Sequence, residues 1–244
     1  MEERLTKSQI KEQRHQERQQ WEAQLAKDQK INGIKKIGMW VSGVVILALS
    51  VWGLIALVNT PQPTSQITNI PPVNSSDITM GSKSAKATLV EYADFQCPAC
   101  AAYHPLVKQL TKEFDGKVLF VYRFYPLTSI HKNAMKSAEA AFAAYNQGKF
   151  WEMHNVLFEH QNDWAESNSP EDTFTKYAQN IHLDMTKYTL DTQGDKTIQF
   201  INNESDGGTT AGINSTPTFF INGHQIQNPQ SYDAFKQLIQ NALK

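Results

Sequence analysis

The only two cysteines of this chain of 244 residues occur together, as Cys97-Pro98-Ala99-Cys100. A strand-like run precedes them and a helix-like apolar spacing follows them, so the first cysteine falls at a predicted helix N-terminus. Unpaired backbone N–H groups and the helix dipole favour a thiolate over a thiol at that position. Pro98 suits the first helical turn, because its missing N–H would have no partner there. The motif therefore predicts a redox-active pair in which the pKa of Cys97 is lowered.

Two other roles of the cysteines were weighed against this one. Half of a zinc site would need two further ligands. The seven histidines include no HxxxH spacing, and the chain has no second CxxC motif. A structural disulfide that closes so short a loop would constrain the unfolded chain little. The sequence also carries no nucleotide or haem motif, so we expect no metal ion and no cofactor beyond the two sulfurs.

Residues 37–58 form an uncharged apolar run of 22 residues. At about 1.5 Å per residue this run is long enough to cross a bilayer core of about 30 Å, which predicts a transmembrane helix. A cleavable signal peptide is the alternative, but 36 residues precede the run and residues 56–58 make a poor cleavage site. Nine Lys and Arg residues precede the run, and the next one after it is Lys83, so we expect the N-terminus in the cytoplasm and the rest outside the cytoplasmic membrane.

The flanking composition divides the rest of the chain. Residues 1–36 are a charged cytoplasmic tail, residues 59–80 are a linker rich in Pro, Ser and Thr, and residues 81–244 are long enough for one domain. The total formal charge is −1. Because nucleic-acid binding needs a clustered basic face, the mildly acidic exported part argues against that class of partner.

Periodicity places the elements of the predicted domain in the order strand–helix–strand, then a helical block, then two strands and a helix. Strand, helix and strand over this length imply a parallel βαβ unit, and Asn222-Gly223 is typical of a tight hairpin turn. The strands are expected at residues 88–94, 117–125, 218–221 and 224–227. The helices are expected at residues 99–114, 131–147, 149–160, 171–180, 185–191, 196–212 and 231–243.

This order resembles the DsbA-like branch of the thioredoxin superfamily, in which a helical insertion interrupts a thioredoxin fold. The resemblance covers about residues 81–244 and rests on four blocks: residues 90–100 (VEYADFQCPAC), 124–127 (FYPL) followed by His131, 148–154 (GKFWEMH) and 216–223 (TPTFFING). It implies an α/β thioredoxin fold with a helical insertion, here preceded by a single transmembrane helix.

The resemblance also implies roles for individual residues. Cys97 matches the exposed cysteine that attacks and is attacked, and Cys100 matches its more buried resolving partner. Pro217 matches a cis-proline that faces the redox pair. Glu91 matches a buried acid that relays a proton to or from Cys100.

Further positions are interpreted on the same basis. An apolar surface for client proteins around the disulfide is expected from Phe95, Pro98 and Thr216, with Tyr125 beside them. Loop and capping roles are expected for Asp94 and Gln96, and packing or surface roles for His131, Trp151 and His154. Two positions depart from the family pattern. Ala99 stands where strongly oxidising members have histidine, which leaves the oxidising strength open, and Ser215 stands where relatives often have glycine, which is expected to alter the approach to the proline loop.

The resulting functional prediction is a membrane-anchored protein disulfide oxidoreductase that forms disulfide bonds in exported proteins. The alternatives are an extracytoplasmic disulfide reductase or isomerase, and a non-catalytic assembly factor that binds peptides. The expected partners are reduced exported client proteins and a quinone-linked membrane reoxidase of the DsbB or vitamin K epoxide reductase type.

Overall fold

The computed structural model describes residues 21, 43, 46–53 and 70–244. The predicted tail and membrane span therefore lie outside the described residues, except for Trp21, Gly43 and residues 46–53, the last of which are helical. Among the described residues, no helix combines the length and the apolar composition that a bilayer crossing needs.

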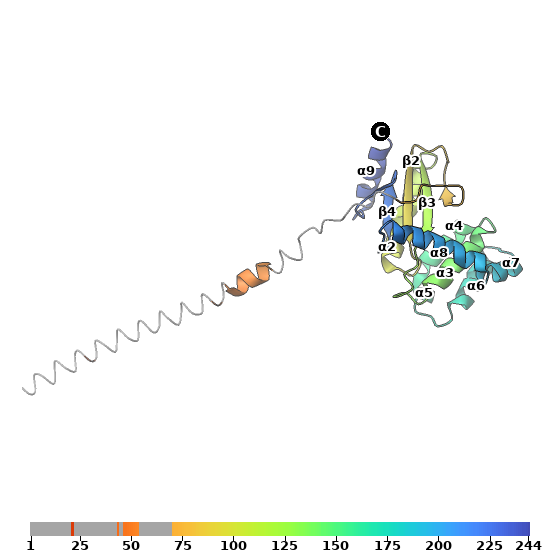
Figure 1. The fold of residues 1–244 in the computed structure, drawn as a ribbon, viewed down its shortest axis with the longest axis horizontal. Helices are drawn as coiled ribbons and strands as arrows, with labels where there is room; N and C mark the ends of the chain where they lie inside the picture. Colours follow the sequence, from red (N-terminus) through yellow and green to blue (C-terminus); the bar gives the residue numbers. More distant parts are fainter. Residues whose placement is uncertain (1–20, 22–42, 44–45, 54–69) are drawn as a thin grey trace, which may run out of the picture. The chain divides into compact units, whose positions relative to one another are not determined.

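A five-stranded sheet forms the centre of the domain that residues 70–244 build (Figure 1). The strands follow the spatial order β1-β3-β2-β4-β5, and β2 and β3 pair in parallel, as the predicted βαβ unit requires. The other neighbouring strands pair antiparallel. The strands are β1 (Ile78–Met80), β2 (Ala87–Ala93), β3 (Val118–Phe124), β4 (Thr218–Ile221) and β5 (His224–Gln225).

Helices surround this sheet, and the helical block forms a separate group at one end of it (Figure 1). α2 (Pro98–Glu113) connects the parallel strands β2 and β3, and α9 (Tyr232–Ala242) closes the domain. α8 runs back from the helical block across β3. The block consists of α3 (Ala134–Tyr145), α4 (Phe150–Glu159), α5 (Gln161–Trp164), α6 (Pro170–Asn180), α7 (Met185–Thr192) and α8 (Asp195–Thr210).

The two faces of the sheet carry different apolar clusters, because successive side chains of a strand point to opposite faces. On one face Leu89 and Phe120 belong to a cluster with residues of α2 and α9. On the other face Val90 and Val121 pack with the residues that follow α8. Both central strands are buried along almost their whole length, which explains why their sequences read as continuous apolar runs.

The predicted linker at residues 59–80 is too long at its C-terminal end. Ile78–Met80 forms the edge strand β1, which pairs with β3. Before it, the buried Asp77 accepts a hydrogen bond of 2.8 Å from Nε of Arg123, whose Nη1 donates to the main-chain oxygen of Pro71 at 2.8 Å. Residues 71–80 thus belong to the domain, because these partners, distant in sequence, order a segment whose composition is that of a linker.

The helical block contains two further differences from the sequence prediction. α5 was not predicted, since four residues are too few to show a helical period; it is held by Trp164, which is fully buried and donates from Nε1 to the main-chain oxygen of Leu157 at 3.0 Å. α3 begins at Ala134 and not at residue 131, so His131 lies in the loop after β3.

Candidate active site

Cys97 stands at the N-cap position of α2, with Pro98 in the first turn of that helix. Neither cysteine is in a disulfide in this structure, and Cys97 is 7% exposed whereas Cys100 is 0% exposed. The Sγ atom of Cys97 lies 3.4 Å from the main-chain oxygen of Thr216, to which it donates as a thiol. The sequence-predicted pair is therefore placed at a helix N-terminus, with both cysteines buried and Cys97 the nearer of the two to solvent.

The surroundings polarise the two sulfurs in opposite directions. A hydrogen bond from the Cys100 thiol is the largest cause that lowers the pKa of Cys97 to about 5, against the opposing effect of partial burial. The Thr216 side chain and the main-chain N–H groups of Ala99 and Cys100 lower that pKa further. Burial holds the pKa of Cys100 well above its usual value, so Cys97 is the thiolate and Cys100 the thiol that donates to it.

Thr216 has a hydroxyl that fits this charge distribution. Its Oγ1 atom is buried and has no hydrogen-bond partner within residues 70–244. Once Cys97 is a thiolate, the hydroxyl has an acceptor, which is the physical reason that Thr216 lowers the pKa of Cys97.

The peptide bond between Thr216 and Pro217 is cis, as the resemblance implied. Pro217 is buried directly before β4, and its main-chain oxygen accepts a hydrogen bond of 2.7 Å from Nδ2 of Asn228. This loop and the first turn of α2 thus form the two sides of the Cys97 sulfur site.

Glu91 lies on β2 and is 3% exposed. Its neighbours across the sheet are Tyr122 on β3 and Phe219 on β4, and burial raises the pKa of Glu91 to about 8. Its charge in turn raises the pKa of Cys100, which places the two groups within electrostatic reach of each other. A carboxyl that is largely protonated near neutral pH is suited to give a proton to a departing Cys100 thiolate.

The expectation that Phe95 offers a client surface is wrong. Its ring is 1% exposed, stacks on Tyr122 with ring centroids 5.3 Å apart, and lies 4.8 Å from the ring of Phe158. Tyr125 is buried as well, and its hydroxyl donates to the main-chain oxygen of Ile213 at 2.6 Å. The turn after β2 directs the Phe95 side chain into the helical block, so only Pro98 and Thr216 of the expected client surface reach solvent.

Three buried amide side chains that the sequence prediction did not assign to the site hold the cysteine turn. Gln161 on α5 donates from Nε2 to the main-chain oxygens of Phe95 and Cys97, at 2.7 and 3.0 Å. Gln96 accepts from the main-chain N–H of Asn133 at 2.6 Å, and Nδ2 of Asn133 donates in turn to main-chain oxygens of the last residue of α5 and the residue after it. Isolated Gln and Asn residues have no spacing that marks such a network in a sequence.

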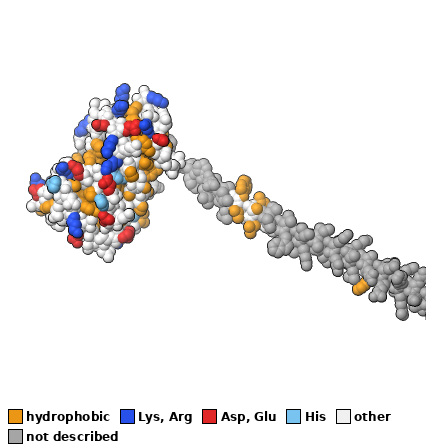
Figure 2. Space-filling model, turned by 180° about the vertical axis from the view of Figure 1, so that it is seen from behind, with side chains coloured by type: hydrophobic (Ala, Val, Ile, Leu, Met, Phe, Trp, Pro, Cys, Tyr) orange, Lys and Arg blue, Asp and Glu red, His pale blue; other side chains and the backbone are white. Residues whose placement is uncertain are grey.

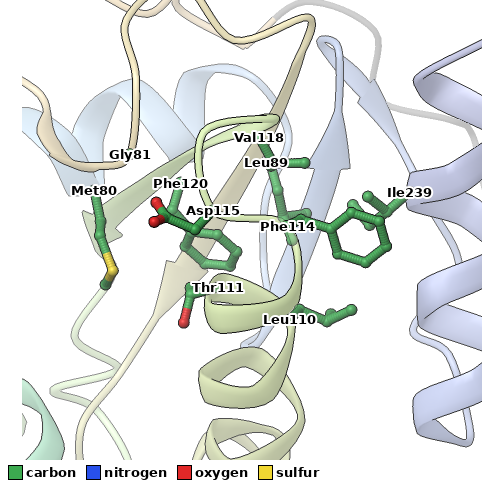
Figure 3. A pocket seen from close by; sticks show the side chains of 10 residues that line it. All are labelled: Met80, Gly81, Leu89, Leu110, Thr111, Phe114, Asp115, Val118, Phe120 and Ile239. Carbon is green, nitrogen blue, oxygen red and sulfur yellow. The ribbon is translucent and has the colours of Figure 1, made fainter.

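An apolar cleft at the other end of α2 is separate from this site (Figure 3). Leu110, Phe114 and Ile239 line it, whereas Cys97 precedes the first turn of the same helix. Its interior space is about 10 Å³, which is about what one water molecule needs, so it has no room for a cofactor. Within the part of the chain that the structure describes, no group of three or more His, Cys, Asp or Glu side chains is arranged to hold a metal ion.

Comparison with known proteins adds a family and a fold. The family described as Thioredoxin matches residues 73–241. The crystal structure of oxidised BdbD from Bacillus subtilis is similar with a TM-score of 0.65 and 23% identity, over 73% of this chain and 98% of that one. The thiol-disulfide exchange protein alpha-DsbA2 from Wolbachia pipientis is similar with a TM-score of 0.60 and 20% identity, over 69% of this chain and 88% of that one.

A curated relative from Salinispora tropica carries the name Na(+)/H(+) antiporter NhaA 3 and is 34% identical over 167 residues. That match covers 68% of this chain but 25% of the relative, so the chain spans about a quarter of that protein's length. The antiporter name describes the whole of the longer protein and is not transferred to this chain.

Proposed function

The chain belongs to the thioredoxin family and has a DsbA-like fold, and from this premise we propose that it is a membrane-anchored protein disulfide oxidoreductase that forms disulfide bonds in exported proteins. The observation that carries the proposal is the opposite polarisation of the two sulfurs. Cys97 at the N-terminus of α2 has a pKa lowered to about 5, and the buried Cys100 has a raised pKa.

The reaction follows from this asymmetry. In the oxidised protein a client thiolate attacks the Cys97 sulfur, the bond between Cys97 and Cys100 breaks, and Cys100 leaves as a thiolate that takes a proton from Glu91. A second client thiolate then attacks the client sulfur of the mixed disulfide and expels Cys97 as a thiolate. Two electrons pass from the client to the cysteine pair, so the client gains a disulfide and the protein ends with reduced cysteines.

The direction of net transfer depends on how strongly the reduced form is stabilised. A thiolate at Cys97 that the Cys100 thiol, Thr216 and main-chain N–H groups all favour is a good leaving group, and it makes the disulfide form more oxidising. These contacts stabilise the Cys97 thiolate in a motif that has Ala99 where strongly oxidising members of the family have histidine. They support the oxidase over the reductase.

Anchoring in the cytoplasmic membrane is part of the same proposal. Residues 37–58 carry no charge, and the described residues 46–53 within them are helical. Large apolar side chains of this segment are exposed; they are Ile46, Leu47, Leu49, Val51 and Trp52. Exposed apolar side chains on a helix are stabilised by lipid, and the basic residues before position 37 favour a cytoplasmic N-terminus with an extracytoplasmic catalytic domain.

The proposed partners are reduced exported client proteins and a quinone-linked membrane reoxidase of the DsbB or vitamin K epoxide reductase type. Each turnover leaves the cysteine pair reduced, so an electron acceptor has to restore the disulfide. On the face of the domain shown in Figure 2, acidic and basic side chains are interspersed and do not gather by sign, which fits protein clients better than nucleic acid.

The test uses the full chain in detergent, equilibrated with reduced and oxidised glutathione, together with a reduced model client. We expect wild type to oxidise the client, Cys97→Ser to lose this activity, and Cys100→Ala to accumulate a mixed disulfide with the client through Cys97. We further expect a reduction potential well above that of thioredoxin, which is about −270 mV. A thioredoxin-like potential would favour a reductase. If Cys97→Ser loses client oxidation but still prevents aggregation of the reduced client, the peptide-binding assembly factor would be favoured.

A further inference from the structure

Asp94 follows β2, and its side chain is fully buried. Its Oδ1 atom accepts from the main-chain N–H of Gln96 at 2.8 Å. Its Oδ2 atom accepts from the main-chain N–H of Leu127 at 2.9 Å and lies 2.6 Å from Nδ1 of His131. A buried carboxylate is unfavourable unless it is paired, and His131 is its only side-chain partner within residues 70–244.

The main chain of Asp94 also contacts both cysteines. Its oxygen accepts from the N–H of Cys97 at 3.1 Å. A main-chain hydrogen bond from Asp94 lowers the pKa of Cys100, against the larger opposing effect of burial. A displacement of Asp94 therefore changes the surroundings of both sulfurs.

His131 reaches this turn from the loop between β3 and α3, and its side chain is 16% exposed. Because an ionised carboxylate can only accept hydrogen bonds, Nδ1 of His131 has to be the donor. The histidine thus connects the loop after β3 to the turn that ends in Cys97, which the sequence-based packing role did not anticipate.

We propose that His131 is a positioning residue for the redox pair, which acts by donating a hydrogen bond to Asp94 and so fixes the turn that carries Cys97. This inference rests on the proposed function. Without that donor, the buried Asp94 carboxylate keeps two main-chain donors and no side-chain partner. A second negative charge on Cys97 then becomes less favourable, and the reduced form loses part of its stabilisation.

The experiment compares three substitutions in the full chain. His131→Leu removes the donor, whereas His131→Asn places an amide nitrogen near the position of Nδ1. His224→Leu is the matched control, because His224 is exposed on the edge strand β5, at the hairpin end of β4 and away from Pro217. The measurements are the equilibrium constant with glutathione, the ultraviolet titration of the Cys97 thiolate, and thermal unfolding.

We expect His131→Leu to shift the glutathione equilibrium roughly three- to tenfold toward the disulfide, as a rise of about half a unit to one unit in the pKa of Cys97 would produce. His131→Asn should restore most of the wild-type constant, and His224→Leu should leave it unchanged. If His131→Leu does not fold, His131→Gln serves instead, because its amide nitrogen lies farther from the position of Nδ1, and the same direction of shift is expected.

An unchanged equilibrium constant in the donor-deficient variant overturns the inference, even if its unfolding temperature falls. An equal shift in His131→Asn or in His224→Leu overturns it as well, because the effect would not depend on the donor. Failure of the wild-type pair to exchange with glutathione is a distinct result: it would overturn the proposed function and this inference with it.

Discussion

Two carboxyl groups of this protein, the buried Glu91 and the half-buried Glu204, share a raised pKa and differ in what they face. Burial raises the pKa of Glu91 to about 8 and that of Glu204 to about 8. Glu91 acts electrostatically on Cys100, whereas Glu204 on α8 accepts a hydrogen bond of 2.7 Å from the main-chain N–H of Phe124. Variants of Glu91 and Glu204 can therefore distinguish the effect of such an acid on folding stability from its effect on the chemistry of the cysteines.

The stability of the fold should depend on pH through Glu91. Its pKa is raised from 4.5 to about 8 in the folded protein, so between these values the folded protein binds more protons than the unfolded chain. The free energy of unfolding then falls as pH rises through this window and levels off above it. Glu91→Gln should flatten this part of the wild-type curve, measured by urea unfolding across the pH range.

Glu204→Gln is the control for this prediction. It should flatten the pH dependence of unfolding in the same way but leave the rate of client oxidation unchanged, whereas Glu91→Gln should slow it roughly 10²-fold or more as expected when a general acid is lost. Equal oxidation rates in the two variants would show that Glu91 is a buried acid without a role in proton transfer.

At the level of single residues, the sequence predicts the reacting groups better than the groups that hold them. Cys97 and Cys100 lie in a short motif with fixed spacing, and Pro217 and Glu91 are expected from the family resemblance. The direction of Phe95 was missed because alternation along a strand stops at the turn that follows it. The network around Gln161 joins residues that are 64 and 66 positions apart, and a single sequence does not show such pairings.

Among the elements, α8 contains two adjacent glycines, Gly207 and Gly208, whose surroundings differ. A Cβ atom on Gly208 would lie 3.0 Å from ring atoms of both Tyr92 and Tyr125. A Cβ atom on Gly207 would find its nearest neighbour, Cγ of Pro71, at 3.4 Å. The close approach of the helix to the aromatic side chains of the sheet therefore depends on Gly208.

Gly208→Ala should destabilise the fold by about 1–3 kcal/mol, because the added methyl group overpacks two buried rings. Gly207→Ala should be neutral or stabilising by up to about 1 kcal/mol, because alanine favours the helix. Urea unfolding midpoints of the two variants measure the difference. Equal midpoints would mean that the helix shifts freely over the sheet at this point.

The elements that were predicted correctly are those with a long apolar signal. β2, β3 and most helices follow the expected ranges within a few residues. β1 and α5 were missed because three and four residues are too few to show a period, and both depend on tertiary partners. The start of α3 was placed too early, because the hydrogen bond between His131 and Asp94 belongs to a loop that sequence periodicity cannot separate from the helix.

For the whole molecule, the border between linker and domain can be tested by truncation. A chain that starts at residue 70 keeps β1 and the pair of Asp77 with Arg123, whereas a chain that starts at residue 81 loses both. Arg123 is 3% exposed with residues 70–80 in place, and the shorter chain would leave its charge without the carboxylate of Asp77. We expect the shorter chain to lose about 3 kcal/mol or more of stability, measured by urea unfolding.

Arg123→Leu in the shorter chain provides the internal check on this explanation. Removing the unpaired buried charge should recover part of the lost stability, whereas the same substitution in the longer chain should destabilise it by stranding Asp77. Equal stability of the two truncated chains would place the start of the domain at residue 81 after all.

The hydrogen bonds between Arg123 and the segment from Pro71 to Asp77 also determine where a force applied to the N-terminal side of the chain would first act on the domain. Tension arriving from the N-terminal side meets the apolar contacts of Ile70 and Val73 with the sheet, the hydrogen bonds of Arg123 to this segment, and the short pairing of β1 with β3. α2 and the loop before β4, which carry the sulfur site, are not the first points of load. A pull from the N-terminal side would therefore load the segment before β1 and this edge of the sheet before it loads the turn that carries Cys97.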